Sequence, residues 1–210
     1  MVDILVPEIE RAMPGYEGRG GASSTRRNLA RQRALLEAAR SLLIEKGYAA
    51  VTVEEITKRA GTSKQTFYRW WPGKGALFLE LYERVAPPGL LDVDTGSLTG
   101  DLRALLTELF AVYRETGVGR ALAGLVGEMT GDPALAERMR GEYLARRRAL
   151  LQSVFDRAAA RGELRPDADT GTAVEMLTGA IWFRLMTGTV EPDADFARRL
   201  AATMARGVLR

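Results

Sequence analysis

Apolar residues along this chain follow the three-to-four-residue spacing of helices. From about Arg27 to Lys46 they fall on one face of a predicted helix, which Gly47 then ends. The residues of that face are Leu35, Leu36, Ala39, Leu42 and Leu43. No convincing alternating pattern, as a half-buried strand would show, occurs anywhere. The predicted fold class is therefore all-α.

Two short helices are predicted next, joined by a tight turn. Thr52 and Glu55 have the spacing of a capping box, in which each side chain satisfies a free backbone N–H at a helix start, so a helix is expected over about 53–60. Gly61 ends it, and a third helix follows over about 64–70. The pattern is that of a helix-turn-helix.

The rest of the chain is also predicted to be helical. A fourth helix starts near Lys74 and ends before Pro87. Glycine and proline then divide five further predicted helices, near 101–115, 118–129, 133–160, 168–187 and 193–209.

Three segments are expected. Residues 1–25 contain several Gly and Ser without helical periodicity and are predicted to be a flexible arm. Residues 26–75 form the predicted three-helix domain with the helix-turn-helix, and residues 76–210 a helical bundle.

Composition closes off several kinds of chemistry. The chain has no cysteine and no histidine, so disulfides, thiolate nucleophiles and the commonest general base and metal ligand are absent. We predict no catalytic residue, no metal and no cofactor. No run of about 18 apolar residues occurs, and no signal peptide is recognisable, so neither a membrane association nor export is expected. The expected location is the cytoplasm.

Positive charge is concentrated in one block. The chain carries a formal +3, yet residues 26–75 alone hold 11 Lys and Arg against 4 Glu. That surplus suits a polyanion such as DNA. On charge alone, a solvated Arg-rich face is an equally good interpretation.

The segment TVEEITKRAGTSKQTFYRWWPGK, residues 52–74, closely resembles the DNA-binding signature of the TetR family of bacterial repressors. The helical second half is similar in size and layout to that family's ligand-binding and dimerisation region. The resemblance implies a transcriptional regulator, most simply a repressor, that binds a palindromic operator in double-stranded DNA as a homodimer and is released by a small-molecule ligand. Two positions depart from the pattern: Gln65 replaces a small residue, and Gly73 replaces a capping Ser.

The third helix of such a motif enters the major groove, where its first turn reaches base edges. Lys64, Gln65 and Thr66 are the predicted base readers, and Arg27, Thr52, Tyr68 and Lys74 are expected to position the protein on phosphates. The predicted DNA-contacting residues are Arg27, Thr52, Ser63, Lys64, Gln65, Thr66, Tyr68, Arg69 and Lys74. Each has an alternative: Thr52, for example, serves equally well as a cap alone.

Large apolar residues in the second half are mostly core, but the resemblance implies that some line a ligand cavity. The candidates are Phe110, Tyr113, Met129, Tyr143, Phe155, Met176, Trp182 and Phe183. The last two helices carry apolar residues on more than one face, which favours a dimer interface there, although a monomer core could absorb the same residues. The candidates are Leu177, Ile181, Leu185, Phe196, Leu200 and Met204.

Three other functions compete with a ligand-controlled repressor, in which a ligand would shift the helix after Lys74. The nearest is a regulator without a ligand. A nonspecific nucleic-acid-binding protein would bind without an operator and with a steep salt dependence. An enzyme using paired carboxylates is disfavoured, because most Asp and Glu fall at predicted helix starts and exposed turns.

Overall fold

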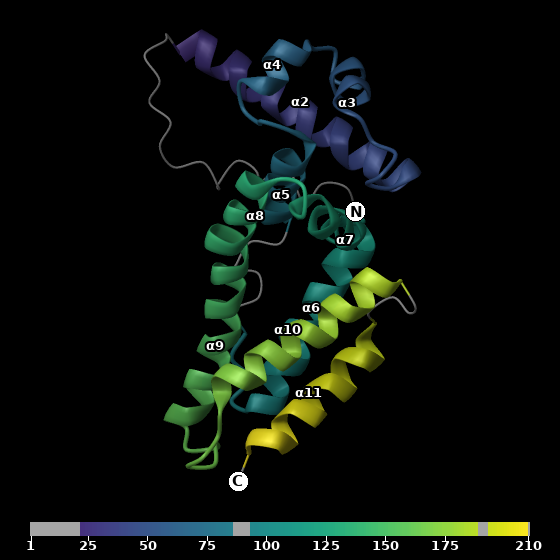
Figure 1. Ribbon diagram of the computed structural model, residues 1–210. Coiled ribbons are helices and arrows are strands. Elements are labelled where there is room, and N and C mark those ends of the chain that lie inside the picture. The colour runs from purple at the N-terminus through teal and green to yellow at the C-terminus, as the bar shows by residue number, and fades with distance from the viewer. Residues whose placement is uncertain (1–21, 86–92, 189–192, 210) are drawn as a thin grey trace. The chain divides into compact units, whose positions relative to one another are not determined.

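The computed structural model describes residues 22–85, 93–188 and 193–209, and these are helices joined by short turns (Figure 1). The all-α prediction is confirmed. Within these ranges no strand occurs, and the β-pairing consists of an isolated bridge between Leu164 and Leu209. No helix within them is long and apolar enough to cross a membrane.

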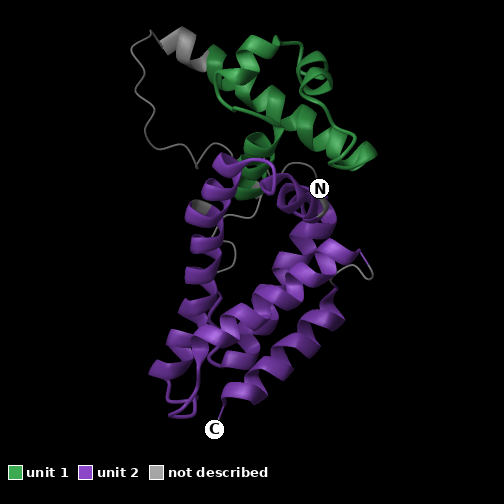
Figure 2. Ribbon diagram, viewed as in Figure 1, with its two compact units in different colours: residues 1–85 green, residues 86–210 purple. Residues whose placement is uncertain are grey.

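The chain forms two compact units, which comprise residues 1–85 and residues 86–210 (Figure 2). The boundary lies ten residues later than the one expected at 75/76. The reason is that α5 (Lys74–Val85) packs on α2 (Ala22–Lys46), with Leu77 and Leu81 buried. The fourth helix therefore belongs to the N-terminal unit.

The first described helix of the N-terminal unit begins at Ala22, earlier than the predicted start at about Arg27. Ala22 to Thr25 are already part of α2, so the predicted arm of residues 1–25 is wrong for its last four positions. The remainder of that arm lies outside the described residues. α2 ends before Gly47, whose φ of +76° is a left-handed conformation that glycine adopts without strain.

The two short helices are α3 (Val53–Arg59) and α4 (Lys64–Tyr68). The predicted capping box is confirmed: the Glu55 amide donates to the Thr52 hydroxyl at 3.3 Å, and the Thr52 amide donates to the Glu55 carboxylate at 3.1 Å. Hydrogen bonds from Lys46 and from Thr52 lower the pKa of Glu55 to about 2. The start of α3 is thus fixed both to its own cap and to the end of α2.

Aromatic residues fill the core of this unit. Trp71 and Phe67 are fully buried with ring centroids 5.5 Å apart. The half-buried carboxylate of Glu80, on α5, accepts hydrogen bonds from the Trp71 indole at 2.6 Å and from Gln32, on α2, at 3.1 Å. Arg84 pairs with the same carboxylate. This network ties the segment after α4 to the two long helices.

The C-terminal unit contains α6 (Leu98–Thr116), α7 (Val118–Met129), α10 (Thr170–Thr187) and α11 (Ala194–Val208), close to the predicted ranges. The predicted helix over 133–160 is interrupted. It comprises α8 (Pro133–Arg138), a π-helical segment η2 (Met139–Leu144) and α9 (Ala145–Ala160). α11 lies alongside α6 (Figure 1), where the small side chains of Ala197 and Ala201 allow close packing.

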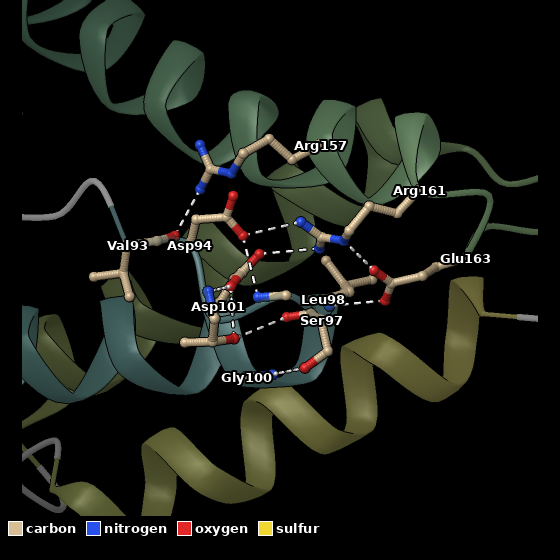
Figure 3. Close-up of polar contacts among 11 residues, drawn as sticks. Val93, Asp94, Ser97, Leu98, Gly100, Asp101, Arg157, Arg161 and Glu163 are labelled. Atoms are coloured by element: carbon tan, nitrogen blue, oxygen red, sulfur yellow. Dashed lines mark hydrogen bonds and ion pairs between the residues drawn. The ribbon is translucent and has the colours of Figure 1, made fainter.

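A cluster of polar contacts holds the start of α6 against the end of α9 (Figure 3). The fully buried carboxylate of Asp101 accepts hydrogen bonds from the Thr95 amide (2.5 Å) and from Arg161 (3.1 Å). Glu163 accepts the Leu98 amide at 2.8 Å, which satisfies a free N–H of the first turn of α6. Burial by itself raises the pKa of Asp101, but these hydrogen bonds outweigh that effect and lower the pKa below its ordinary value.

Candidate functional site

The turn between α3 and α4 brings two short helices together over a small core. Ile56, on α3, and Phe67, on α4, are fully buried. Gly61 stands in the turn with a φ of +62°, a conformation in which other residues are strained. Burying one side of so short a helix leaves the rest of α4 facing solvent.

The solvent-facing side of α4 carries Lys64, Gln65 and Tyr68, and Arg69 follows as the residue that caps its C-terminal end; all four are exposed. At 100° per residue these four cover one arc of the helix, opposite the arc of the buried Phe67. Tyr68 is 55% exposed, so more than half of its surface is open to solvent. The arc therefore presents an amide, a phenol and two cations to whatever approaches it.

One of those cations already has a partner. The Lys64 ammonium lies 2.9 Å from a carboxylate oxygen of Glu54, on α3, and this hydrogen bond and the charge of Lys64 lower the pKa of Glu54. Both side chains are more than half exposed, so the pair contributes little stability and can be exchanged for a phosphate. Arg69 and Arg27 are exposed and make no ion pair within the described ranges.

Two of the hydroxyl candidates, Thr52 and Ser63, act as helix caps. Ser63 caps α4 by accepting the Thr66 amide at 3.1 Å, and the two hydroxyls are 3.0 Å apart. The Thr52 hydroxyl donates to Glu55 at 2.8 Å within the capping box. Each side chain therefore has a structural role, as the alternative for Thr52 anticipated, and a phosphate would have to compete with it.

Lys74 lies inside the unit instead of at its rim. Its ammonium donates to the carbonyl oxygens of Tyr48 and Val51, each at 3.2 Å, and stands 4.5 Å from the centroid of the Tyr48 ring. It thus holds the turn that follows α2. The expectation of a phosphate contact at Lys74 does not fit this position, so we leave Lys74 out of the proposed interface.

The C-terminal unit contains a cavity of about 560 Å³ that is partly open to solvent. Its wall comes from α6, α7, η2, α9 and α10. The lining residues are Leu105, Leu109, Tyr113, Val126, Met129, Met139, Tyr143, Leu144, Arg147, Arg148, Leu150, Leu151, Val174, Glu175, Thr178, Gly179, Ile181, Trp182 and Met186. A mostly apolar cavity of this size is typical of small-molecule sites.

Half of the predicted ligand residues reach this cavity. Those that line it are Tyr113, Met129, Tyr143 and Trp182. Phe110 and Phe155 are fully buried elsewhere in the core, and Phe110 stacks on Phe196 with centroids 5.7 Å apart. Met176 and Phe183 point outward and are 59% and 66% exposed. These four residues therefore do not line the cavity, because helical spacing alone does not show which apolar residues of a helix face it.

Sequence reasoning missed most of the wall. The aliphatic residues Leu105, Leu109 and Leu151 gave no signal that distinguishes a cavity from an ordinary core. Arg147 and Arg148 did carry one, since they interrupt the apolar spacing in the middle of a helix.

The predicted dimer residues are packed within the single chain. Leu177, Ile181, Leu200 and Met204 are no more than 9% exposed. The alternative of a monomer core therefore fits them, and residues so buried offer almost no area to a partner. Leu185 and Phe196 are partly exposed.

A different face of α10 is apolar and exposed. Met176, Phe183 and Met186 are each more than half exposed, and Gly179 lies between them at helical spacing. We call these four residues the α10 stripe; two of them, Gly179 and Met186, also line the cavity. They include three of the five exposed large apolar side chains of the described chain, so the exposure is concentrated on one helix. The exposed side of α11, by contrast, carries Asp195 and three arginines.

Two short capped helices, of which the second, α4, turns a polar side to solvent, are typical of helix-turn-helix DNA-binding proteins. Residues 35–81 match the family described as bacterial regulatory proteins, tetR family, and residues 92–204 match the tetracyclin repressor-like C-terminal domain. The chain belongs to the TetR family.

Individual members of the family are similar to this chain over most of their length. The chain is 34% identical to the HTH-type transcriptional regulator YdeS of Bacillus subtilis over 178 residues, which are 84% of this chain and 88% of that relative. Among solved structures, the TetR family transcription regulator SCO0332 has a TM-score of 0.67 and 36% identity, covering 86% of this chain and 99% of that one. NalD of Pseudomonas aeruginosa has a TM-score of 0.61 and 25% identity, covering 87% and 98%.

Proposed function

We propose that this DNA-binding transcriptional regulator is a repressor that binds a palindromic operator as a homodimer and is released by a small molecule. The observation that carries the DNA-binding role is the exposed arc of α4, Lys64, Gln65, Tyr68 and Arg69, held by capped short helices. The repressor assignment is supported by NalD, which is described as a secondary repressor of a multidrug efflux pump. Action on DNA implies a cytoplasmic location.

Gln65 and Arg69 are proposed to read bases, because amide and guanidinium groups make paired hydrogen bonds to base edges in the major groove. Lys64, Thr66 and Tyr68 flank them, and Tyr68 has a hydroxyl suited to a phosphate oxygen. Arg27, with Thr52 and Ser63 at the helix starts, is proposed to add phosphate contacts.

Dimerisation is proposed to use the α10 stripe. Helix-turn-helix proteins read two half-sites with two copies, and a two-fold interface uses the same surface on both. Met176, Gly179, Phe183 and Met186 offer a surface with a small residue at its centre, which lets two helices approach closely. The charged outer side of α11 suits the rim of such an interface.

The cavity is the proposed ligand site, and α10 links it to the dimer. Val174, Thr178 and Trp182 face the cavity, whereas Met176 and Phe183 face outward from the same helix. A ligand that moves α10 would change how the two copies meet, and thereby the spacing of the two DNA-reading helices. The expected shift of α5 remains a prediction.

Selection of bound DNA from a random pool by the full chain tests the function. The expected result is an enriched palindrome whose half-sites are spaced for two copies, and weaker binding by Tyr68→Phe and Arg69→Ala. Glu137→Gln, an exposed change in the other unit, is the control. Binding without an enriched motif, with a steep salt dependence, would establish the nonspecific alternative instead. Operator binding that no small molecule alters would favour the ligand-independent regulator.

A further inference from the structure

The orientation of α4 depends on residues outside the helix. A helix of five residues is not stable by itself, and α4 buries a single side chain, that of Phe67. Ser63 caps its N-terminal end. The C-terminal end must therefore be fixed by the residues that follow it.

Trp71 is the first buried residue after α4 and is joined to that helix twice. Its backbone amide donates to the Phe67 carbonyl oxygen at 3.1 Å. Its ring also packs on the Phe67 ring, with centroids 5.5 Å apart. Because Phe67 is the inward contact of α4, the place and tilt of the Trp71 ring determine how the end of α4 lies on the core.

Glu80, on α5, holds the Trp71 ring through one of its two carboxylate oxygens. The indole N–H donates to Oε2 of Glu80 at 2.6 Å. The other oxygen, Oε1, accepts from the Gln32 amide, on α2, at 3.1 Å and from Nε of Arg84 at 3.0 Å. The two long helices thus anchor the carboxylate by Oε1, and Oε2 is directed at the segment after α4.

The hydrogen bond between Trp71 and Glu80 is short and shielded from water. Trp71 is 1% exposed, and the Glu80 side chain is 24% exposed. Hydrogen bonds to an ionised group are stronger than neutral ones, and they weaken steeply when their angle departs from linear. A buried indole N–H without an acceptor would cost free energy, so the ring is held where Oε2 accepts its N–H.

From these contacts we infer that Glu80 and Trp71 are positioning residues for DNA recognition: Glu80 sets the orientation of α4 through the Trp71 indole, and neither side chain touches DNA. The inference rests on the proposed DNA-reading role of α4. Base contacts require hydrogen-bond geometry, whereas the attraction of cations to phosphates tolerates small shifts. Loss of this hydrogen bond therefore lowers the affinity for the operator more than the affinity for unrelated DNA.

The ratio of two dissociation constants tests the inference, one for the selected operator and one for a scrambled duplex of equal length, both measured by fluorescence anisotropy. Trp71→Phe removes the N–H and keeps an aromatic ring, and Glu80→Met removes the acceptor at similar length. We expect each variant to lose about tenfold of the preference for the operator, roughly the discrimination of one base contact. Partial unfolding would weaken both constants by the same factor and leave their ratio unaltered.

Two combined variants show whether the effect passes through this hydrogen bond. Trp71→Phe together with Glu80→Met should lose no more preference than either change alone, because both break the same contact. Glu80→Gln together with Arg84→Met should keep most of the preference. Its amide oxygen can accept the indole N–H, and its NH2 group then faces Gln32, whose own amide can turn round to accept it.

Glu37→Met is the matched control for Glu80→Met. Glu37 lies on α2 in the same unit and pairs with Arg40 at the surface, where its side chain is 60% exposed. Its replacement changes the charge of the unit by the same amount as Glu80→Met. The affinities for both duplexes should shift together, and their ratio should stay as in the unaltered chain.

Hydrogen exchange on the full chain without DNA gives an independent readout. The amides of Trp70 and Trp71, which donate to the Phe67 carbonyl oxygen, should exchange faster in Glu80→Met than in the unaltered chain. The Ala60 amide, which donates to the Ile56 carbonyl oxygen at the end of α3, should keep its rate. Global unfolding would instead accelerate all three.

Several results overturn the inference: an unaltered ratio in Trp71→Phe and Glu80→Met, an equal loss in Glu37→Met, or an equal loss in Glu80→Gln with Arg84→Met. An unaltered chain that prefers no operator contradicts the proposed function instead. The exchange rates distinguish the two failures, because faster exchange confined to the end of α4 still assigns Glu80 the role of holding that end, and unchanged rates remove it.

Discussion

Lys64 is held by Glu54 on the surface that we propose for DNA, so a carboxylate stands beside the expected phosphates. Binding must break this exposed pair and bring Glu54 towards a polyanion. Both effects reduce the affinity for DNA, and both become smaller at higher salt because salt screens charge interactions.

Glu54→Gln should therefore increase operator affinity by about two- to fivefold near 0.1 M salt, because it frees Lys64 and removes one repulsive charge. Fluorescence anisotropy with the selected operator measures the change. Glu137→Gln, which breaks a similar exposed pair in the C-terminal unit, should leave affinity unaltered. Weaker binding by Glu54→Gln would mean that Glu54 itself contacts DNA or that the start of α3 has been disturbed.

Gln65 is the side chain of α4 best suited to read a base. It is exposed and lies in the first turn of that helix, where a bidentate amide contact discriminates by about 1 to 3 kcal/mol. Gln65→Ala should relax the preference at one position of each half-site while leaving the others. Motifs selected by the two proteins should then differ at that position, and identical motifs would remove Gln65 from the base readers.

Sequence reasoning succeeded for residues whose role is local. The Thr52 cap follows from spacing along the chain, and the exposed arc of α4 follows from the position of Phe67. Lys74 shows where prediction from sequence patterns fails. Its partners, the carbonyl groups of Tyr48 and Val51, lie more than 20 residues away, and no pattern near Lys74 announces them.

At the scale of elements, glycine, proline and capping residues indicated most helix limits correctly, because these signals act on neighbouring residues. The π-helical segment could not be anticipated, since Met139 to Leu144 has no composition that separates it from α-helix. The polar contacts around the start of α6 were not anticipated either. They join Asp101 to Arg161 across about 60 residues.

Asp101 fixes the start of α6, and its replacement tests how much that contact matters. Asp101→Asn leaves one acceptor oxygen: if it accepts from the Thr95 amide, the new NH2 group faces the Arg161 donor, and if it faces Arg161, the Thr95 amide loses its acceptor. We expect the free energy of unfolding to fall by about 2 kcal/mol or more, measured by urea denaturation at pH 7. Glu175→Gln, which affects an exposed pair, should have little effect.

Acid should remove the same contribution. The pKa of Asp101 is lowered in the folded chain, so its stabilising effect is present above the ordinary carboxyl pKa of about 4 and disappears as the pH falls below that value. The stability difference between the unaltered chain and Asp101→Asn should consequently shrink between about pH 4 and pH 2. A constant difference across that range would show that packing, and not ionisation, explains the loss.

For the whole molecule, the proposed function makes α10 the link between ligand binding and dimer assembly. Sequence patterns predicted that the last two helices assemble the dimer, but they selected the inward residues Leu177 and Ile181. α10 is apolar around most of its surface, and only the fold shows which apolar residues the chain itself covers. The uncovered ones, Met176 and Phe183, do not line the cavity, so they can be changed without touching the proposed ligand site.

Met176→Glu combined with Phe183→Glu should yield a folded monomer with weak operator binding. Both side chains are exposed in the single chain, so the change leaves its core intact, whereas two copies would have to bury unpaired carboxylates at a cost of several kcal/mol. Sedimentation should show the monomer, and circular dichroism should show unaltered helicity. Loss of the second half-site also removes the effective-concentration gain, which is on the order of 100-fold.

Two variants separate the α10 stripe from the other possibilities. Ile181→Glu places a carboxylate in the buried, apolar wall of the cavity, so it should lower helicity and thermal stability instead of producing a folded monomer. Thr203→Glu changes the exposed side of α11 and should leave a dimer with normal affinity. If the variant with Met176→Glu and Phe183→Glu remains a dimer and the Thr203→Glu variant becomes a monomer, the interface lies on α11. The cavity and the dimer interface would then have no helix in common. The proposed route, by which a bound ligand moves α10 and changes operator binding, would be wrong.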